Sequence, residues 1–538
     1  MSDAATVPAQ GPPQNPPMAP PAAIPWLGLT AVLLGTFIST LNGRLSTFGL
    51  ADIRGAVHAG FDDGAWITTA QTVAQMFIAP IAIWVGGVYG PRRVLLDAAA
   101  AFAVISAITP FSTNLPMLLG LQFAGGLASG CFIPLTLSFL LRNLPPKYWA
   151  YGVAIYALNL ELSLNISASL EGWYVEHLSW VWIFWQNVPL AIGMVFCLHF
   201  GVPRDPANPN APRADLFGLA SCGMGLALIY AALDQGNRLD WLNSGLIWGL
   251  LLAGAVLLIG FYVHETRTDY PAIDLKVVFT APMPRLLLLV AFLRLTILST
   301  AFLIPQYLQV VRGFRALQVG STLIWIAAPQ LILCPLAGMM LRRTDPRLVS
   351  SIGFIFISVA CLMVAHGLTP LWSSDQFLPS QMLQAVGQSF ALSGIIFFGV
   401  LHLKPQDALS FGAGLQIARL MGGEIGTAFV TTLVRVRSQT ASNLIGLHVQ
   451  TGDGQVVQRL QALAGVAGRS DTGMGVFRAA GLLGGQVRTA AALQGVIDSF
   501  VVVGGLTALA LLLVVAHRPA PLGPASHRPL FSTPGAVA

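Results

Sequence analysis

The chain has 538 residues, of which 55% are hydrophobic and only 9% are charged, and its mean hydropathy is +0.71. Because a soluble domain has about 25% charged residues, this composition excludes a soluble protein and indicates a polytopic membrane protein. The net charge of +6 does not indicate a nucleic-acid partner, since the basic residues stand singly or in pairs between apolar runs.

Apolar stretches long enough to cross a bilayer recur along the chain. Residues 1–25 are rich in Pro and Ala and lack Lys and Arg, so we expect a disordered cytoplasmic tail. About 20 apolar residues span the ~30 Å of hydrocarbon as a helix. Fourteen such spans are predicted, at residues 27–47, 65–86, 93–112, 116–141, 148–171, 179–201, 215–235, 244–263, 285–310, 317–341, 347–367, 376–402, 407–435 and 497–516.

The distribution of basic residues predicts the orientation. An even number of spans puts both termini on one side, and the loops of that side include "GPRR" (90–93), "RNLPPK" (142–147) and "RRTDPR" (342–347). Cytoplasmic loops carry the excess of Lys and Arg, so both termini are expected in the cytoplasm. The segment 436–496 also contains arginines, but long loops are exported largely regardless of charge.

The predicted architecture is all-α, with two six-helix bundles and two extra central spans. Secondary transporters commonly consist of two such bundles with a substrate site between them. The expected units are an N-terminal bundle (26–201), a linker with two extra spans (202–284), a C-terminal bundle (285–516) with a long periplasmic loop (436–496), and a cytoplasmic tail (517–538).

Five stretches in chain order carry a resemblance to a known family: "SWVWIFWQNVPLAIG" (179–193), "LDQGNRLDWLNS" (233–244), "VHETRTDYPAIDLKVV" (263–278), "LIPQYLQVVRGFRALQVG" (303–320) and "ARLMGGEIGTA" (418–428). From about residue 26 to residue 516 the chain resembles the 14-span drug:proton antiporter branch of the major facilitator superfamily. The resemblance implies a bacterial inner-membrane transporter that exports amphipathic compounds against proton entry, in some members with a periplasmic adaptor.

The chain departs from the pattern of this branch in three spans and in one loop. In the first span Asn42 stands at the usual acidic position and Arg44 at a threonine position. Gln122 replaces the arginine of the fourth span, and "SASLEG" (167–172) replaces the Gly-Pro motif of the fifth. Small residues there preserve close helix packing but not a proline kink. The loop "GGVYGPRR" (86–93) keeps a glycine and its arginines but lacks the acidic or doubly basic element of the family pattern.

Asn42 cannot ionise, so proton coupling would require another carboxylate. Candidates inside the spans are Glu161 near the centre of the fifth span, Glu171 near its outer end, and Glu424 near the centre of the thirteenth. Our hypothesis for Arg44 is an ion pair with Glu161 or Glu171 that binds an anionic substrate group or releases the acid to titrate. The alternatives are a static buried pair and an arginine that reaches the outer headgroups.

Other charged residues complete the predicted pathway. Arg294 and Gln309 are expected to line the second bundle's half of the cavity, although Arg294 could instead extend to the inner headgroups. Arg92, Arg93 and Arg419 match family positions and are expected to have structural or gating roles. The segment 436–496 has helical apolar spacing, which fits a structural cover or the docking of an adaptor.

The sequence therefore predicts a multi-pass inner-membrane transporter that exports amphipathic organic compounds or drugs by alternating access, with proton-coupled antiport as the expected mechanism. The alternatives are a uniporter or importer of an organic anion, and a receptor or assembly subunit that does not transport. An enzyme is not expected, because no His-rich metal cluster, Ser/His/Asp set or cofactor fingerprint is found. No cofactor or metal is expected either, and without a Walker sequence the energy source would be a proton gradient rather than ATP.

Overall fold

Within the residues that the computed structural model describes, fourteen helices are long and apolar enough to cross a membrane, which confirms the predicted number. The structure describes residues 26–202, 215–268, 283–403, 408–450, 452–466 and 474–519. The predicted disordered tail (1–25) lies outside the described residues, as does most of the predicted C-terminal tail.

The first six spans are formed by α1 (Trp26–Phe48), α3 with α4 (Phe61–Gly64, Trp66–Tyr89), α5 (Pro91–Ile108), α6 with α7 (Leu115–Gly130, Phe132–Asn143), α8 (Trp149–His177) and α9 with α10 (Trp182–Trp185, Asn187–Gly201). A short helix, α2 (Leu50–Ala56), follows α1. The remaining spans are α11 (Leu216–Gly236), α12 (Gly245–Glu265), α14 (Met283–Val310), α15 (Ala316–Leu341), α16 (Pro346–Gly367), α17 (Ser374–Leu401), α18 (Ala408–Gly446) and α20 (Met474–Val515).

Local capping explains where several of these helices begin. The Asn114 side chain accepts a hydrogen bond from the backbone N–H of Met117 at 2.9 Å and so caps α6. Asp215 caps α11 and Asp345 caps α16 in the same way. A side-chain oxygen satisfies one of the backbone N–H groups that the first turn of a helix leaves unpaired.

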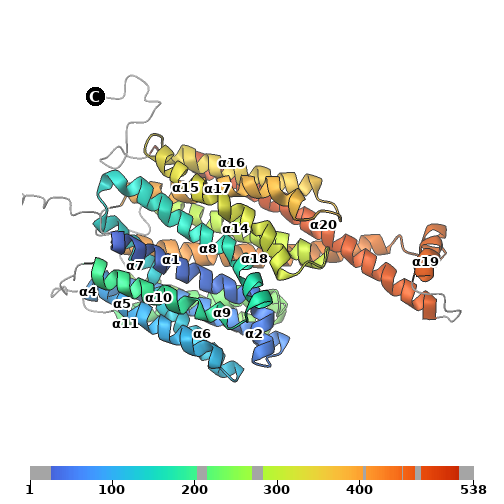
Figure 1. The fold of residues 1–538 in the computed structure, drawn as a ribbon, viewed down its shortest axis with the longest axis horizontal. Helices are drawn as coiled ribbons and strands as arrows, with labels where there is room; N and C mark the ends of the chain where they lie inside the picture. Colours follow the sequence, from blue (N-terminus) through green and yellow to red (C-terminus); the bar gives the residue numbers. More distant parts are fainter. Residues whose placement is uncertain are drawn as a thin grey trace, which may run out of the picture.

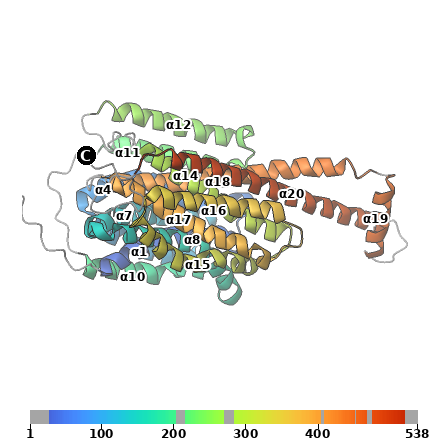
Figure 2. The same cartoon turned by 90° about the horizontal axis from the view of Figure 1, so that it is seen from above.

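The membrane helices pack as two groups, with α11 between them. Helices α1 and α4–α10 contact one another, and α14–α18 contact one another and α20. Helix α11 contacts both α4 of the first group and α18 of the second. Helix α12 packs on α11 and lies at the edge of the bundle, as Figure 2 shows. Of the two extra spans, only α11 therefore reaches the interior between the groups.

Helices α8 and α15 join the two groups at close range. A Cβ added at Gly320 would lie 2.6 Å from the Cα of Ser169, and the Ser169 hydroxyl donates a hydrogen bond to the Gly320 carbonyl at 2.8 Å. Nearby, the Asn165 amide donates to Gln388 of α17 at 2.9 Å. The close packing expected from the small residues of "SASLEG" (167–172) is thus present at this interface.

The segment 436–496, predicted as a long loop with helical apolar spacing, is largely helical where the structure describes it. Helix α18 continues to Gly446, α20 begins at Met474, and α19 (Gly454–Val466) lies between them. These helices project from one end of the bundle (Figure 1). With 39 residues, α18 is about 58 Å long, roughly twice the hydrocarbon thickness. Hydropathy reports only the apolar part of such a helix, so the sequence underestimates its length.

Candidate functional site

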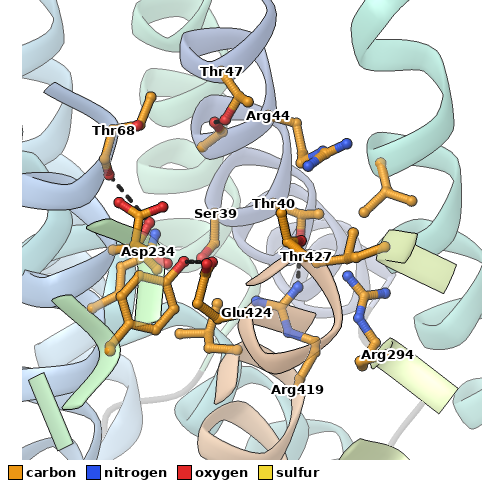
Figure 3. A pocket seen from close by; sticks show the side chains of 17 residues that line it. Ser39, Thr40, Arg44, Thr47, Thr68, Asp234, Arg294, Arg419, Glu424 and Thr427 are labelled. Atoms are coloured by element: carbon orange, nitrogen blue, oxygen red, sulfur yellow. Dashed lines mark hydrogen bonds between the residues drawn. The ribbon is translucent and has the colours of Figure 1, made fainter. Parts of the chain in front are cut away.

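A polar cavity of about 160 Å³ lies where the two groups of helices meet α11 (Figure 3). Helices α1, α4 and α8 line it from the first group, α14 and α18 line it from the second, and α11 completes the wall. Five lining side chains can carry a charge: Arg44, Asp234, Arg294, Arg419 and Glu424. Ionisable groups at membrane depth are costly and mark substrate or ion pathways. The cavity is therefore the candidate functional site.

The cavity lies in the half of the bundle from which α18 and α20 project. Thr47 lines it near the end of α1, Thr68 near the start of α4, and Asp234 near the end of α11. Toward the opposite end, α18 meets α7: a Cβ added at Gly412 would lie 2.7 Å from the carbonyl oxygen of Pro134. The two groups are thus in backbone contact on the side where α1 begins.

Two of the three arginines have polar partners on the protein. Arg294 of α14 donates from Nη1 to Oε1 of Glu161 on α8 at 2.8 Å, and both side chains are almost fully buried, with exposed fractions of 3% and 0%. Arg419 donates to the hydroxyl of Thr40 at 3.2 Å and to Oε1 of Gln416 at 2.9 Å. The Arg294–Glu161 pair therefore joins the two groups of helices through a buried ion pair.

Arg44 has no carboxylate partner among the described residues. Its guanidinium carbon lies 5.3 Å from the ring centroid of Phe48. The Nε atoms of Arg44, Arg294 and Arg419 are all buried, and each lacks a hydrogen-bond partner in the described structure. A buried donor without a partner loses the hydrogen bond that water would give it. The cavity thus contains guanidinium groups whose donors the protein leaves unsatisfied.

The two acids of the cavity are hydrogen-bonded to the protein. Asp234 accepts from the Thr69 hydroxyl and, at 3.0 Å, from the amide of Gln235. Glu424 accepts from the Tyr230 hydroxyl at 2.8 Å. Tyr230 and Asp234 both belong to α11, so the extra span supplies one cavity carboxylate and the partner of the other.

The structure does not pair Arg44 with Glu161 or Glu171. Glu161 faces α14 across the interface and is bound by Arg294. Glu171 is buried near the end of α8, outside the cavity lining, and its Oε2 atom has no hydrogen-bond partner among the described residues. Arg44 lines the cavity with α11 and α18. The positions of Arg44 and the two glutamates along their helices are not enough to predict such a pair, because they contain no information on which way each helix is turned.

Two residues predicted for the pathway lie within the first group and not on the cavity. Asn42 accepts a hydrogen bond from the amide of Asn187 on α10 at 2.7 Å. Gln122 of α6 donates to the hydroxyl of Ser46 on α1 at 3.5 Å. Both are buried. At the positions where the chain departs from the family pattern, uncharged amides thus connect α1 to its neighbours.

The remaining predicted residues are also outside the cavity lining. Gln309 is exposed near the end of α14. Arg92 donates to two carbonyl groups in the last turn of α10, at 3.3 and 3.0 Å. Arg93 is exposed and lies 4.0 Å from Asp97. The cavity therefore brings together Arg44, Arg294, Arg419 and Glu424 of the predicted set.

Tyr230 and Asp234 are cavity residues that are absent from the predicted set. The sequence contains a signal for Asp234, because it is a carboxylate inside a predicted span (215–235) and such groups are functional by default. Tyr230 carries no comparable signal, since a tyrosine in an apolar helix commonly serves packing or the membrane interface.

Comparison with known families gives one match over most of the chain. Residues 32–429 match the family model described as Major Facilitator Superfamily. The matched region includes all of the residues that line the cavity.

Two bacterial relatives align over about three quarters of the chain. The "Probable multidrug resistance protein EmrY" of Escherichia coli (strain K12) is 27% identical over 421 residues, which cover 76% of this chain and 80% of that protein. The "Multidrug export protein EmrB" of the same organism is 25% identical over 403 residues, covering 75% of this chain and 79% of that protein.

Among solved structures, that of the human organic anion transporter MFSD10 superimposes with a TM-score of 0.58. The superposition covers 93% of this chain and 100% of the human chain, at 14% sequence identity. At that identity the likeness concerns the fold alone.

Proposed function

The chain belongs to the major facilitator superfamily of membrane transporters, and from that premise we propose that it exports amphipathic organic compounds by alternating access. The bacterial relatives named for multidrug export and resistance support this proposal. We further propose that its working units are the predicted bundles 26–201 and 285–516, with the extra spans in 202–284.

The observation that carries the proposal is the charged cavity between the two groups of helices. Secondary transporters bind substrate near the midplane between two bundles and expose it alternately to each side. Here side chains from both groups face one cavity, and the Arg294–Glu161 pair lies across the same interface.

We propose proton antiport as the energy source and Glu424 as the proton carrier. Glu424 lines the cavity, and its partner is the hydroxyl of Tyr230. A phenol can donate to a carboxylate and accept from a carboxylic acid, so this hydrogen bond is compatible with both protonation states. Glu161 is bound instead by Arg294, a permanent cation that favours only the ionised form.

The test is proton movement driven by substrate in proteoliposomes that contain the purified protein and an internal pH dye. Lipophilic cations and organic anions serve as probes. We expect probe-dependent proton flux in the wild type and its loss in Glu424→Gln. Glu176→Gln, a change at an exposed glutamate near the end of α8, is the matched control. Probe flux without proton movement would overturn antiport, and saturable binding without any flux would favour a receptor.

We propose an inner-membrane location with both termini in the cytoplasm, on the basis of the arginine-rich loops. In this orientation α18, α19 and α20 project into the periplasm. The projection carries exposed apolar side chains, among them Leu444, Leu447 and Phe477, whose exposed fractions are 57%, 65% and 81%. Such exposure supports docking of a periplasmic adaptor protein on this hairpin.

A further inference from the structure

The acidic and the basic side chains of the cavity differ in how fully the protein satisfies their hydrogen-bonding groups, and this difference indicates which substrate the cavity fits. Figure 3 shows Arg44 and Arg294 on one side of the view and Asp234 and Glu424 on the other. The acids accept hydrogen bonds from Thr69, Gln235 and Tyr230. The guanidiniums of Arg44 and Arg294 instead keep buried Nε–H donors without a partner in the described structure. A ligand would therefore find its unmet donors on the arginine side.

Of these two guanidinium groups, that of Arg44 has fewer partners on the protein. It forms no ion pair with a described residue, and its Nε atom is buried. Unpaired charge in a membrane protein is expensive, so such groups face a partner or a watery cavity. Glu424 of the same cavity is hydrogen-bonded to Tyr230 at 2.8 Å, and Glu161 is held by Arg294 at 2.8 Å.

The lining also offers room for an apolar body. Leu164, Leu298 and Leu420 face the same cavity from α8, α14 and α18. Ligand sites in proteins typically combine an apolar wall with a few well-placed polar groups. A guanidinium can bind a carboxylate through two parallel hydrogen bonds.

We propose that the cavity binds the anionic head of an amphipathic compound, a carboxylate, between Arg44 and Arg294. This inference rests on the proposed transport function and deepens it by naming the substrate class. Arg44 is the specificity-determining residue, because it stands where the family pattern has a threonine and contributes a cation that the protein itself leaves unpaired. Arg419, already bound to Thr40 and Gln416, adds positive charge beside the site.

The test uses three probes that share a two-ring aromatic body and differ in the head group: naphthoate, naphthamide and naphthylmethyl-trimethylammonium. Saturable binding is measured on the purified full-length protein in nanodiscs, and flux is measured in proteoliposomes. We expect naphthoate to bind most tightly. We expect Arg44→Gln to weaken naphthoate binding by at least about tenfold and to leave naphthamide binding unchanged, because only the charge-assisted contact is lost.

Three further variants make the result specific. Arg44→Lys keeps the charge and should retain part of the preference for naphthoate. Arg488→Gln, a change at an exposed arginine on the projecting part of α20, should have no effect. If Arg44→Gln does not fold, Thr47→Glu places a carboxylate three residues from Arg44 on the same cavity wall, where it should compete for the guanidinium and reduce naphthoate binding.

The outcomes separate this inference from the proposed function. Flux of the ammonium probe in preference to naphthoate would support the transport function and overturn the proposed anion site. If naphthoate binding depends on Arg44 but no probe is transported, the anion site would be supported and the transport function would be overturned. Unchanged naphthoate binding in Arg44→Gln and Thr47→Glu would assign Arg44 a structural role, and absence of binding by every probe would overturn the site as well.

Discussion

The buried ion pair between Arg294 and Glu161 allows a quantitative prediction about the interface between the two groups of helices. The perturbation is Glu161→Gln, which removes the charge and keeps the shape of the side chain. The pair lies at an N–O distance of 2.8 Å with almost no solvent exposure. At an effective dielectric constant of about 20, the Coulomb attraction at that distance is about 6 kcal/mol.

Desolvation offsets much of this attraction, so the pair itself contributes far less than its Coulomb term. Removal of one partner, however, leaves a buried charge without compensation and costs about 3–5 kcal/mol. We expect Glu161→Gln at the lower end of that range, because the amide oxygen can still accept a hydrogen bond from Arg294. The double variant Glu161→Gln/Arg294→Gln should lie within about 1 kcal/mol of the wild type, since two neutral amides can bond to each other.

Thermal unfolding in detergent can be followed through the cysteines. All five free cysteines are buried, so a fluorophore that reacts with thiols reports their exposure on unfolding. We expect a lower apparent Tm for Glu161→Gln, recovery of most of the loss in the double variant, and no change for the exposed Glu176→Gln. The single variant Arg294→Gln completes the comparison. If the loss of Tm in the double variant equalled the sum of the losses in Glu161→Gln and Arg294→Gln, the two residues would not be coupled and the reasoning would be refuted.

Three further predictions concern packing, pH and orientation. Gly426→Val should destabilise the protein by ~1–3 kcal/mol, because the added Cβ would lie 2.4 Å from a backbone oxygen of α14; Gly260→Val, where nothing lies within 4 Å, should leave the Tm unchanged. Hydrogen bonds from the Asn243 amide and then from Arg435 of α18 hold the pKa of the exposed Asp240 carboxyl below its ordinary value. The contacts of Asp240 should therefore persist from neutral pH to about pH 4 and weaken only as the pH falls through that lowered pKa. An increase in hydrogen exchange of the Asp240 loop already near neutral pH would contradict this prediction. A membrane-impermeant maleimide added to intact cells should label Gly446→Cys at the end of α18 but not the wild type, and labelling only after lysis would reverse the proposed orientation.

The sequence determines the number of spans and the fold class because both follow from local properties. A run of about 20 apolar residues must form a helix to satisfy its backbone groups in lipid, whatever its neighbours are. The two extra spans and the resemblance to 14-span transporters are readable for the same reason. The lengths of α18 and α20 are not, because beyond the lipid their sequence is no longer apolar and the hydropathy signal ends before the helix does.

Which charged residues meet is decided only by the tertiary structure. Depth along a helix is a one-dimensional quantity, and by depth alone Arg44 and Glu161 are suitable partners. The rotation of α8 instead turns Glu161 toward Arg294, which is 133 residues away in the chain, and α11 brings Tyr230 to Glu424 over 194 residues. Sequence determined that Arg44 stands in a membrane helix where charge is costly. Packing decided that it faces a cavity whose two carboxylates, Asp234 and Glu424, are hydrogen-bonded to other residues. The direction of a side chain around a helix axis is set by the helices packed against it.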